Sequence, residues 1–514
     1  MLPRPKTVQV HDGMFTWNER TGLATDSSLS DVGHWLRTTL GPATGCWLPP
    51  GEPGLTLTLD PTAGPEAYTL DVTPTAIRVR GGSSAGVQYG LQTLRQLLPP
   101  ATYAQARVRL GPFSVPCLSI ADEPRFGWRG CLLDVARHFL PKGDVLRFID
   151  LLALHKFNVL QLHLTDDQGW RLPVPGWPRL TEVGAWRRES PIGHYRHDQA
   201  DGRPHGGFYP REELVEIVAY AADRHVTVVP EVDLPGHVQA AIAAYPELGG
   251  PGPTEVSTVW GISPRVLNLS DRALAFCRDV LDEVVAIFPS PYIAVGGDEC
   301  PTTEWETGPA AQARLRSEGL TSVAALQSWF TARLAEHLRP YGRSILGWDE
   351  ILDGGAPADA VIGAWRGPHA TVAAVAAGHD VVACPETSVY LDYRQSSHPD
   401  EPIPVGRLLT LEDVYAFDPV PADLTAEQAK QILGVQACVW TEYMESARVI
   451  DYMAFPRLCA LAEVAWSGPG LPEPDFAGRL RVHKGRLRAY GVEYRRDTGP
   501  HPWQVRPDAR GWPR

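Results

Sequence analysis

The sequence lacks long apolar segments and is poor in positive charge. Its 514 residues contain no run of about 18 apolar residues, and residues 1–6 lack the apolar stretch of a signal peptide. The chain has 47 Lys and Arg against 60 Asp and Glu, a net charge of -13. Nucleic acids and anionic membrane surfaces bind basic faces, and membrane insertion needs a long apolar segment. The chain lacks both features, so neither is an expected partner.

Closely spaced cysteine pairs are absent as well. The eight cysteines are scattered, without a CxxC pair or metal-finger spacing, and Cys131, Cys384 and Cys438 lie inside apolar runs. These three are expected to be buried thiols. Together with the absent signal they predict a cytoplasmic protein; a secreted protein whose signal has been removed is the alternative.

Tryptophan, by contrast, is abundant, with 16 residues. Several stand beside carboxylates, as in residues 347–350 (Gly-Trp-Asp-Glu) and 440–442 (Trp-Thr-Glu). Aromatic faces next to carboxylates suit sugar rings, which present both C–H patches and hydroxyls. Core packing is the alternative interpretation for most of these tryptophans.

Residues 1–121 are expected to form a small α+β domain. Residues 55–59, 67–72 and 76–80 alternate apolar and polar side chains, which is typical of half-buried antiparallel strands. Residues 83–98 place their leucines on one face and predict a helix that Pro99 and Pro100 end. No catalytic group stands out, so we interpret this domain as structural or docking.

From residue 122 onward, apolar strands alternate with helical stretches. Eight strands are predicted at 131–135, 157–163, 226–232, 292–295, 344–348, 361–365, 381–384 and 434–440, and helices at 142–155, 210–224, 271–287, 322–339, 369–377 and 450–466. This pattern predicts a (β/α)8 TIM-type barrel over 122–480, followed by a C-terminal extension, 481–514, packed on the barrel. The link between strands five and six is short. An open doubly wound sheet is the alternative, although no glycine-rich phosphate loop follows the first strand.

Barrel enzymes carry their chemistry at the C-terminal ends of the strands, and every predicted strand here ends in charged or aromatic residues. They are Asp134, Arg137, His163, Asp166, Asp167, Glu231, Asp233, Asp298, Glu299, Trp348, Asp349, Glu350, Trp365, Arg366, Tyr390, Asp392, Trp440 and Glu442. Carboxylates and tryptophans recurring at one face indicate a carbohydrate pocket. A generic barrel site is the alternative.

The fourth predicted strand runs into Gly296, Gly297, Asp298 and Glu299. Neighbouring side chains on an extended chain point in opposite directions, so both carboxylates serve one pocket only if the backbone bends after Gly297. The simpler interpretation of an isolated Asp-Glu pair is that it caps the next helix.

Several ordered motifs resemble those of the family-20 glycoside hydrolases, the β-N-acetylhexosaminidases. They are Arg129-Gly130 with LDVARHF (133–139), HLTDDQGWR (163–171), GGFY (206–209), VPEVDLPGH (229–237) and GGDEC (296–300). The likeness covers about residues 83–470, and the small domain is similar to the one that usually precedes this family's barrel. One departure is Ala294, where members commonly carry His.

The resemblance implies exo-acting removal of terminal β-linked GlcNAc or GalNAc, with retention and through an oxazolinium intermediate formed by the substrate's own acetamido group. Glu299 would be the general acid and base, Asp298 would orient the acetamido group, and Tyr390 would donate to its oxygen. The remaining implied residues bind or support: Trp348, Trp365 and Trp440 would enclose the sugar, Arg137, Asp392 and Glu442 would hold its hydroxyls, and Asp166 and His225 would support Glu299.

No cofactor or metal is implied, and the expected partner is a small carbohydrate, such as a chitooligosaccharide or a glycan end, bound by a monomer or homodimer. Two other functions stay open: a conventional retaining glycosidase using Glu231 and Glu299, and a non-catalytic sugar-binding protein. A metal-dependent barrel hydrolase is disfavoured because His163 has no second His two residues on. Glu231 and His237 are further strand-end candidates, although such residues are often structural.

Overall fold

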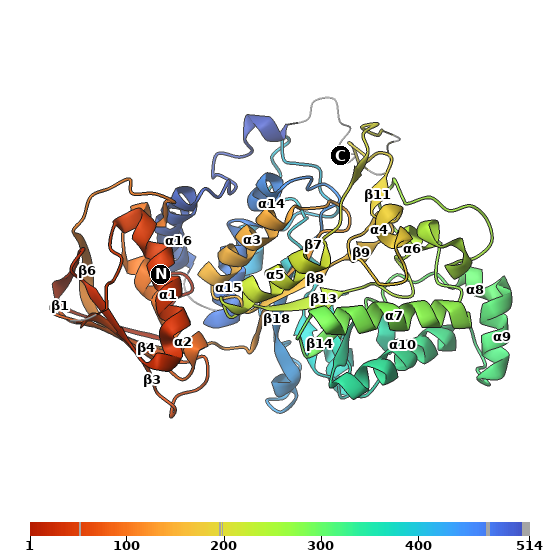
Figure 1. The fold of residues 1–514 in the computed structure, drawn as a ribbon, viewed down its shortest axis with the longest axis horizontal. Coiled ribbons are helices and arrows are strands. Elements are labelled where there is room, and N and C mark those ends of the chain that lie inside the picture. The colour runs from red at the N-terminus through yellow and green to blue at the C-terminus, as the bar shows by residue number, and fades with distance from the viewer. Residues whose placement is uncertain (51–52, 195–196, 198, 469–472, 506–514) are drawn as a thin grey trace.

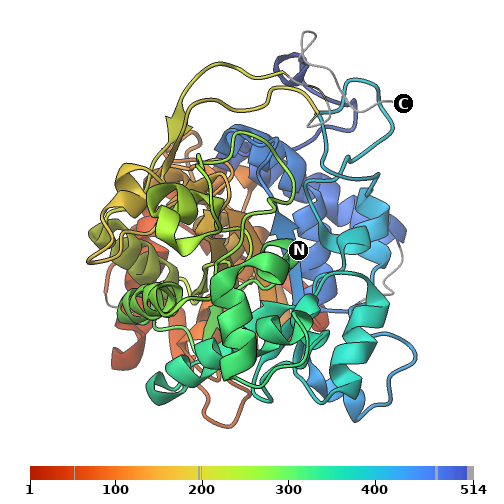
Figure 2. The same cartoon turned by 90° about the vertical axis from the view of Figure 1, so that its right-hand side faces the viewer.

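The computed structural model describes residues 1–50, 53–194, 197, 199–468 and 473–505. It consists of an N-terminal sheet domain at one end and a barrel domain that makes up the rest (Figure 1). Figure 2 shows the helices of the barrel domain from the opposite end, with the N-terminal sheet on the far side. Among the residues that the structure describes, no helix is both long enough and apolar enough to cross a membrane.

The N-terminal domain is a six-stranded sheet in the order β1-β6-β4-β5-β3-β2, covered by helices α1 (Ser30–Thr44) and α2 (Ser84–Leu97). Its strands are β1 (Thr7–Trp17), β2 (Gly22–Thr25), β3 (Pro53–Leu59), β4 (Tyr68–Val72), β5 (Ile77–Gly81) and β6 (Phe113–Asp122). The predicted α+β domain and its three strands and helix are confirmed, but residues 55–59 were expected to pair in antiparallel fashion, and β3 is parallel to both of its neighbours. Pairs β1-β6, β6-β4 and β4-β5 are antiparallel, whereas β5-β3 and β3-β2 are parallel.

The barrel domain closes on eight parallel strands, as predicted. They are β7 (Trp128–Asp134), β8 (Val159–His163), β13 (Thr227–Glu231), β14 (Tyr292–Ala294), β15 (Ser344–Trp348), β16 (Val361–Ala364), β17 (Val381–Ala383) and β18 (Ile432–Val439), with β18 pairing back to β7. Seven of these strands each contribute one side chain to a separate apolar cluster, and Ala294 is its member from β14. The residue that departs from the family motif is therefore a fully buried packing residue.

Helices surround the barrel and connect its strands. The main ones are α3 (Lys142–Leu154), α5 (Arg211–Ala222), α7 (Asp271–Ile287), α10 (Ala324–Leu338), α11 (Pro368–Ala376), α14 (Ala447–Ala454) and α15 (Arg457–Trp466). The link between β15 and β16, the fifth and sixth barrel strands, contains the 3-10 turn η5 (Asp349–Leu352) in place of an α-helix. This is why the predicted link between these strands is short. The predicted helix 450–466 is two helices, because Pro456 cannot donate the backbone hydrogen bond that would continue α14.

Long loops at the C-terminal ends of the strands carry the short elements. They are β9 (Thr165–Asp166), β10 (Gly169–Trp170), α4 (Arg179–Glu182), β11 (Trp186–Arg187), β12 (His205–Gly206), α6 (Gln239–Ala244), α8 (Thr303–Thr307), α9 (Pro309–Ser317), α12 (Glu386–Val389) and α13 (Leu411–Ala416). The predicted domain boundary at residue 480 falls inside α16 (Glu473–Tyr490), which packs against η2 (Pro100–Tyr103) of the N-terminal domain. Residues 506–514 of the predicted extension lie outside the described residues.

Buried charges join the two domains. Lys156, after α3, places its Nζ 3.1 Å from Asp122 Oδ2, and both side chains are fully buried. Trp466 at the end of α15 donates its indole N–H to the same carboxylate at 3.0 Å, and Arg129 of β7 pairs with Glu66 at 2.7 Å. Removing one partner of such a buried pair leaves an uncompensated charge, so these contacts hold the domains in one arrangement.

Candidate active site

The turn after β14 places Asp298 and Glu299 in one pocket. Gly296 and Gly297 have φ of 64° and 86°, and a Cβ on Gly296 would lie 1.9 Å from Asp233 Oδ1. Only glycine fits this approach, and the Gly297 N–H donates to the same oxygen at 3.3 Å. The bend predicted after Gly297 thus occurs across both glycines.

Both carboxylates lie near one imidazole. His237 Nε2 is 3.8 Å from Asp298 Oδ2 and 3.6 Å from Glu299 Oε2. Asp298 and Glu299 therefore face the same site. The simpler interpretation, that they cap the next helix, is wrong, because the N-cap of α8 is Thr302. Glu299 itself has φ of 42°, an uncommon backbone conformation for a non-glycine residue. The contacts of the surrounding residues must therefore hold the turn in this conformation.

Asp298 shares its surroundings with a second acid. Burial raises the pKa of Asp298 to about 6. The charges of Glu299 and Glu231 add to this rise, and His237 opposes it. Burial and the charge of Asp298 raise the pKa of Asp233 well above its usual value. The nearby like charge of Asp298 therefore adds to burial in favouring the neutral form of the Asp233 carboxyl. Asp298 Oδ1 is buried without a hydrogen-bond partner among the described residues.

The histidine beside Glu299 is His237, and this corrects the prediction made for His225. His225 lies just before β13, at the opposite end of the strand, where its electrostatic neighbours are Glu66 and Asp223. His237 follows β13, and its Nδ1 is 3.2 Å from both Asp166 Oδ1 and Asp167 Oδ2.

These carboxylates favour the protonated form of His237. Burial by itself lowers the pKa of His237, but the charge of Asp166 and hydrogen bonds to Asp166 and Asp167 raise it well above the usual value. Asp166 therefore reaches Glu299 through His237. The signal for His237 was present in the sequence, since it closes the stretch 229–237 at a strand end, whereas His225 lies before its strand.

Arg137 anchors the other side of Asp166. Its Nη2 lies 2.8 Å from Asp166 Oδ2, and His163 Nε2 lies 2.9 Å from the same oxygen. Burial opposes ionisation of Asp166, yet Arg137 and its other cationic neighbours hold the pKa of this carboxyl well below the usual range. Arg137 also pairs with Asp134 at 3.2 Å and stacks 5.1 Å from the ring of Trp440.

Four aromatic rings make a continuous wall. The rings of Trp348 and Trp440 lie 6.0 Å apart, those of Tyr390 and Trp440 lie 6.3 Å apart, and Trp365 stacks on Tyr390 at 6.2 Å and 23°. The structure thus brings together the three predicted tryptophans and the predicted tyrosine, which come from the ends of four strands. Such a surface suits the apolar faces of a sugar and an acetamido methyl group.

Buried carboxylates fix two of these rings from behind. The Trp348 indole N–H donates to Glu231 Oε1 at 3.0 Å, and Glu231 Oε2 also accepts from Gln161 and lies 2.9 Å from His163 Nδ1. Both oxygens of Glu231 are therefore engaged within the protein.

Trp365 is held in the same way by Glu350. The Trp365 indole N–H donates to Glu350 Oε2 at 2.9 Å, and burial together with the charge of Asp298 raises the pKa of Glu350 to about 8. Sequence reasoning placed Glu350 and Asp233 at strand ends without giving them a role. Only the three-dimensional approach of these acids to Trp365 and Asp298 reveals one.

Asp392 and Glu442 offer acceptors that the protein leaves unused. Three of their buried oxygens have no hydrogen-bond partner among the described residues: both carboxylate oxygens of Asp392 and Oε2 of Glu442. Burial and the charge of Glu442 raise the pKa of Asp392 well above its usual value, and burial raises that of Glu442 while Arg137 opposes the rise. Buried acceptors without partners are rare, so these oxygens are candidates to accept hydrogen bonds from the hydroxyls of a ligand.

Three sets of site residues have ligand atoms close enough to surround a metal ion: His163 with Asp166 and Asp233, Asp166 with Asp167 and His237, and Asp233 with His237 and Asp298. In the first two, Asp166 is already paired with Arg137 and both histidines. In the third, Asp166 and Asp167 lie 3.2 Å from His237 Nδ1 and favour the protonated imidazole. The charges therefore favour ion pairs over a metal-ligand set, which needs neutral imidazole.

Known proteins share both domains. The family model described as "Glycosyl hydrolase family 20, catalytic domain" matches residues 126–469, and the one described as "Glycosyl hydrolase family 20, domain 2" matches residues 1–123. A protein of Porphyromonas gingivalis named β-hexosaminidase is 40% identical over 433 residues, which cover 84% of this chain and 54% of the relative. The match thus spans about half the length of that relative.

Solved structures agree over almost the whole chain. An exo-β-N-acetylglucosaminidase from Vibrio harveyi, crystallised with N-acetylglucosamine, is 34% identical with a TM-score of 0.86, covering 96% of this chain and 78% of the other. A β-N-acetylhexosaminidase from Streptomyces coelicolor is 32% identical with a TM-score of 0.84, covering 96% and 97%. The resemblance, the fold class and the prediction of a glycoside hydrolase are confirmed.

Proposed function

We propose that this chain, which belongs to glycosyl hydrolase family 20, removes terminal β-linked N-acetylhexosamine from the non-reducing ends of oligosaccharides with retention of configuration. The observation that carries the proposal is the pairing of Asp298 and Glu299 in one pocket, opposite an aromatic wall that includes Tyr390. In this family the substrate's 2-acetamido oxygen serves as the nucleophile, so the protein supplies a positioner and a proton donor.

Asp298 is the positioner. It is ionised above a pH of about 6, accepts the acetamido N–H, and offsets the positive charge that develops on the oxazolinium ring. Tyr390 donates its hydroxyl to the attacking acetamido oxygen and so fixes the in-line geometry. Alignment of an intramolecular nucleophile is worth several kcal/mol of barrier, about 7–11 in favourable cases.

Glu299 handles the proton. It gives a proton to the leaving glycosidic oxygen and later takes one from the water that opens the oxazolinium ion. His237 lies 3.6 Å away, and Asp166 and Asp167 favour its protonated form, so it orients this carboxyl and stabilises the ionised form after the first transfer. Asp166 acts through His237, and His225 has no part in the reaction.

Trp348, Trp365 and Trp440 enclose the acetamido group and the sugar ring. Arg137, Asp392 and Glu442 hold the hydroxyls of the terminal sugar, and the unpartnered oxygens of the two acids support this assignment. Charged hydrogen bonds that need a free terminal hydroxyl favour exo cleavage. The Vibrio harveyi relative is named as an exo-acting enzyme, which agrees with this assignment.

A conventional retaining mechanism with Glu231 as nucleophile has less support. Glu231 lies behind the indole of Trp348 and is fully buried, with both oxygens engaged by Trp348, Gln161 and His163. A purely sugar-binding role has no use for a proton donor beside the acetamido positioner. We also propose that the protein acts in a reducing compartment, because its eight cysteines are all unpaired thiols.

The test is a substrate panel with the full chain. Aryl β-N-acetylglucosaminides and β-N-acetylgalactosaminides should be cleaved, with the β-anomer released first in an NMR time course. The matching aryl β-glucoside, which lacks the acetamido group, should react at least about a thousandfold more slowly, because it has no internal nucleophile. Equal cleavage of the glucoside, or first release of the α-anomer, would overturn the proposal.

A further inference from the structure

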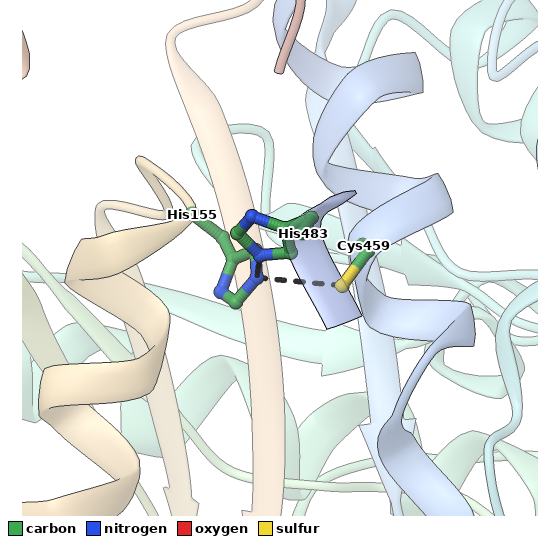
Figure 3. A group of neighbouring side chains, drawn as sticks. All are labelled: His155, Cys459 and His483. Carbon is green, nitrogen blue, oxygen red and sulfur yellow. Dashed lines mark hydrogen bonds between the residues drawn. The ribbon is translucent and has the colours of Figure 1, made fainter. Parts of the chain in front are cut away.

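A second cluster of metal-ligand side chains lies outside the barrel strands, away from the catalytic pocket. His155 at the end of α3, Cys459 of α15 and His483 of α16 converge in the interior (Figure 3). All three are at most 1% exposed, and their ligand atoms lie within 4.8 Å of one another. The mechanism proposed above uses none of them.

The ring of His155 is oriented as a metal ligand usually is. Its Nδ1 lies 2.7 Å from the Leu151 carbonyl oxygen, which can only accept, so Nδ1 carries the proton and Nε2 presents its lone pair. Metal-bound histidines typically have their second nitrogen held by a carbonyl or carboxylate in this way. This Nε2 faces the centre of the cluster, where it accepts hydrogen bonds from His483 Nε2 at 2.9 Å and from Cys459 Sγ at 3.4 Å, and a bound metal ion would replace both.

These separations are close to those of a d10 metal site. Zinc–nitrogen and zinc–sulfur bonds of about 2.0–2.1 and 2.3 Å in a tetrahedral site place the ligand atoms about 3.3–3.6 Å apart. The observed distances require the two imidazoles to separate by only a few tenths of an ångström. Two imidazoles and one thiolate are ligands that both Zn²⁺ and Cu⁺ favour.

We propose that His155, Cys459 and His483 bind one d10 metal ion, Zn²⁺ or Cu⁺, which ties the C-terminal helix α16 to α3 and α15. This structural site is separate from the hydrolase chemistry. Since α16 also packs on the N-terminal domain, the ion would brace the junction between the two domains.

Binding involves one proton loss and one proton shift. The Cys459 thiol gives its proton to solvent as the metal–sulfur bond forms, and burial raises the pKa of this thiol, so the metal must displace the proton. His483 must carry its proton on Nδ1, which is 3.5 Å from the Arg486 guanidinium, a group that cannot accept a hydrogen bond. Arg486 therefore weakens the site, and replacing it with an acceptor should strengthen metal binding.

The test uses the full-length protein, loaded anaerobically with Zn²⁺ or Cu⁺ and desalted. One equivalent of metal per chain is expected, with an X-ray absorption spectrum that shows two nitrogen neighbours and one sulfur. Two histidine nitrogens together with one sulfur separate this site from the sets in the catalytic pocket, each of which contains a single histidine. Loading should raise Tm, and a chelator should reverse the rise while aryl-glycoside cleavage persists.

Variants complete the experiment. Cys459→Ser and His483→Gln should lose the tightly held ion, whereas Cys277→Ser, which alters an equally buried cysteine on α7 outside the cluster, should keep it. Arg486→Gln, which offers His483 Nδ1 an acceptor oxygen, should hold the ion more tightly in competition with a chelator. Wild-type protein that retains no ion after loading, or an ion without a sulfur neighbour, would overturn the proposal even if a variant failed to fold.

Discussion

Replacing Asp298 with asparagine removes the charge that the proposed mechanism needs most while it keeps the size of the side chain. The pocket already places a cationic group at a comparable distance from this carboxylate when His237 is protonated, since His237 Nε2 is 3.8 Å from Asp298 Oδ2. An oxazolinium charge at a similar distance of about 4 Å, with an effective dielectric constant of about 20, interacts with the carboxylate by about 4 kcal/mol. Asp298→Asn should therefore lower kcat by about a thousandfold.

The pH profile supplies a second readout for the same variant. Because the ionised form is required and burial raises the pKa of Asp298 to about 6, kcat/KM of the wild type should fall tenfold per unit as the pH drops below about 6. Asp298→Asn should lose this dependence, since asparagine does not titrate.

Steady-state assays with an aryl N-acetylglucosaminide measure both effects. Asp353→Asn is the control, because this carboxylate likewise follows a barrel strand, β15, and lies 3.5 Å from Arg366, but it is 71% exposed; the activity of this variant should stay within about twofold of wild type. A loss below tenfold in Asp298→Asn, or an acid limb that persists unchanged, would refute the reasoning.

Three further substitutions probe the other groups of the site. Tyr390→Phe should lower kcat about 100- to 1,000-fold, as loss of a donor to a reacting oxygen does, whereas Tyr393→Phe, whose hydroxyl bonds Glu386 instead, should not; equal effects would contradict the assignment. Glu299→Gln should spare substrates with nitrophenolate leaving groups at least about 100-fold more than natural disaccharides, as judged from the ratio of kcat/KM values. His237→Asn should raise the pH of the acid limb of kcat/KM, because removal of a cation raises the pKa of Asp298 further; an unmoved limb would show that His237 is only structural.

Much of the fold could be predicted from periodicity because parallel barrel strands are buried on both faces. β7 and β8 are entirely buried and read as apolar runs in the sequence. Strands β1, β2 and β6 and helix α1 of the N-terminal domain were not predicted. Most of β1 is exposed and β2 has only four residues, whereas β6 does alternate buried and exposed residues, so its pattern was available in the sequence. The break at Pro456 was missed because apolar residues continue across it.

The candidate site was predictable where a residue ends a strand. Asp298, Trp348 and Trp440 stand at such ends, and the structure brings them to one pocket. The prediction for His225 was wrong although the sequence distinguishes the two histidines: His225 precedes its strand, whereas His237 follows the strand, at the C-terminal end where barrel sites lie. The pairing of Asp233 with Asp298 depends on a close approach across the Gly296 turn, which no spacing in the chain reveals.

Inhibition by a thiazoline analogue of N-acetylglucosamine tests the central claim most directly. This molecule is a stable mimic of the oxazoline intermediate, so it should bind competitively and at least about 100-fold more tightly than the substrate's KM, with Asp298→Asn losing most of that affinity. Absence of tight binding, together with a covalent sugar adduct on a carboxylate such as Glu231 found by mass spectrometry, would contradict a substrate-assisted mechanism.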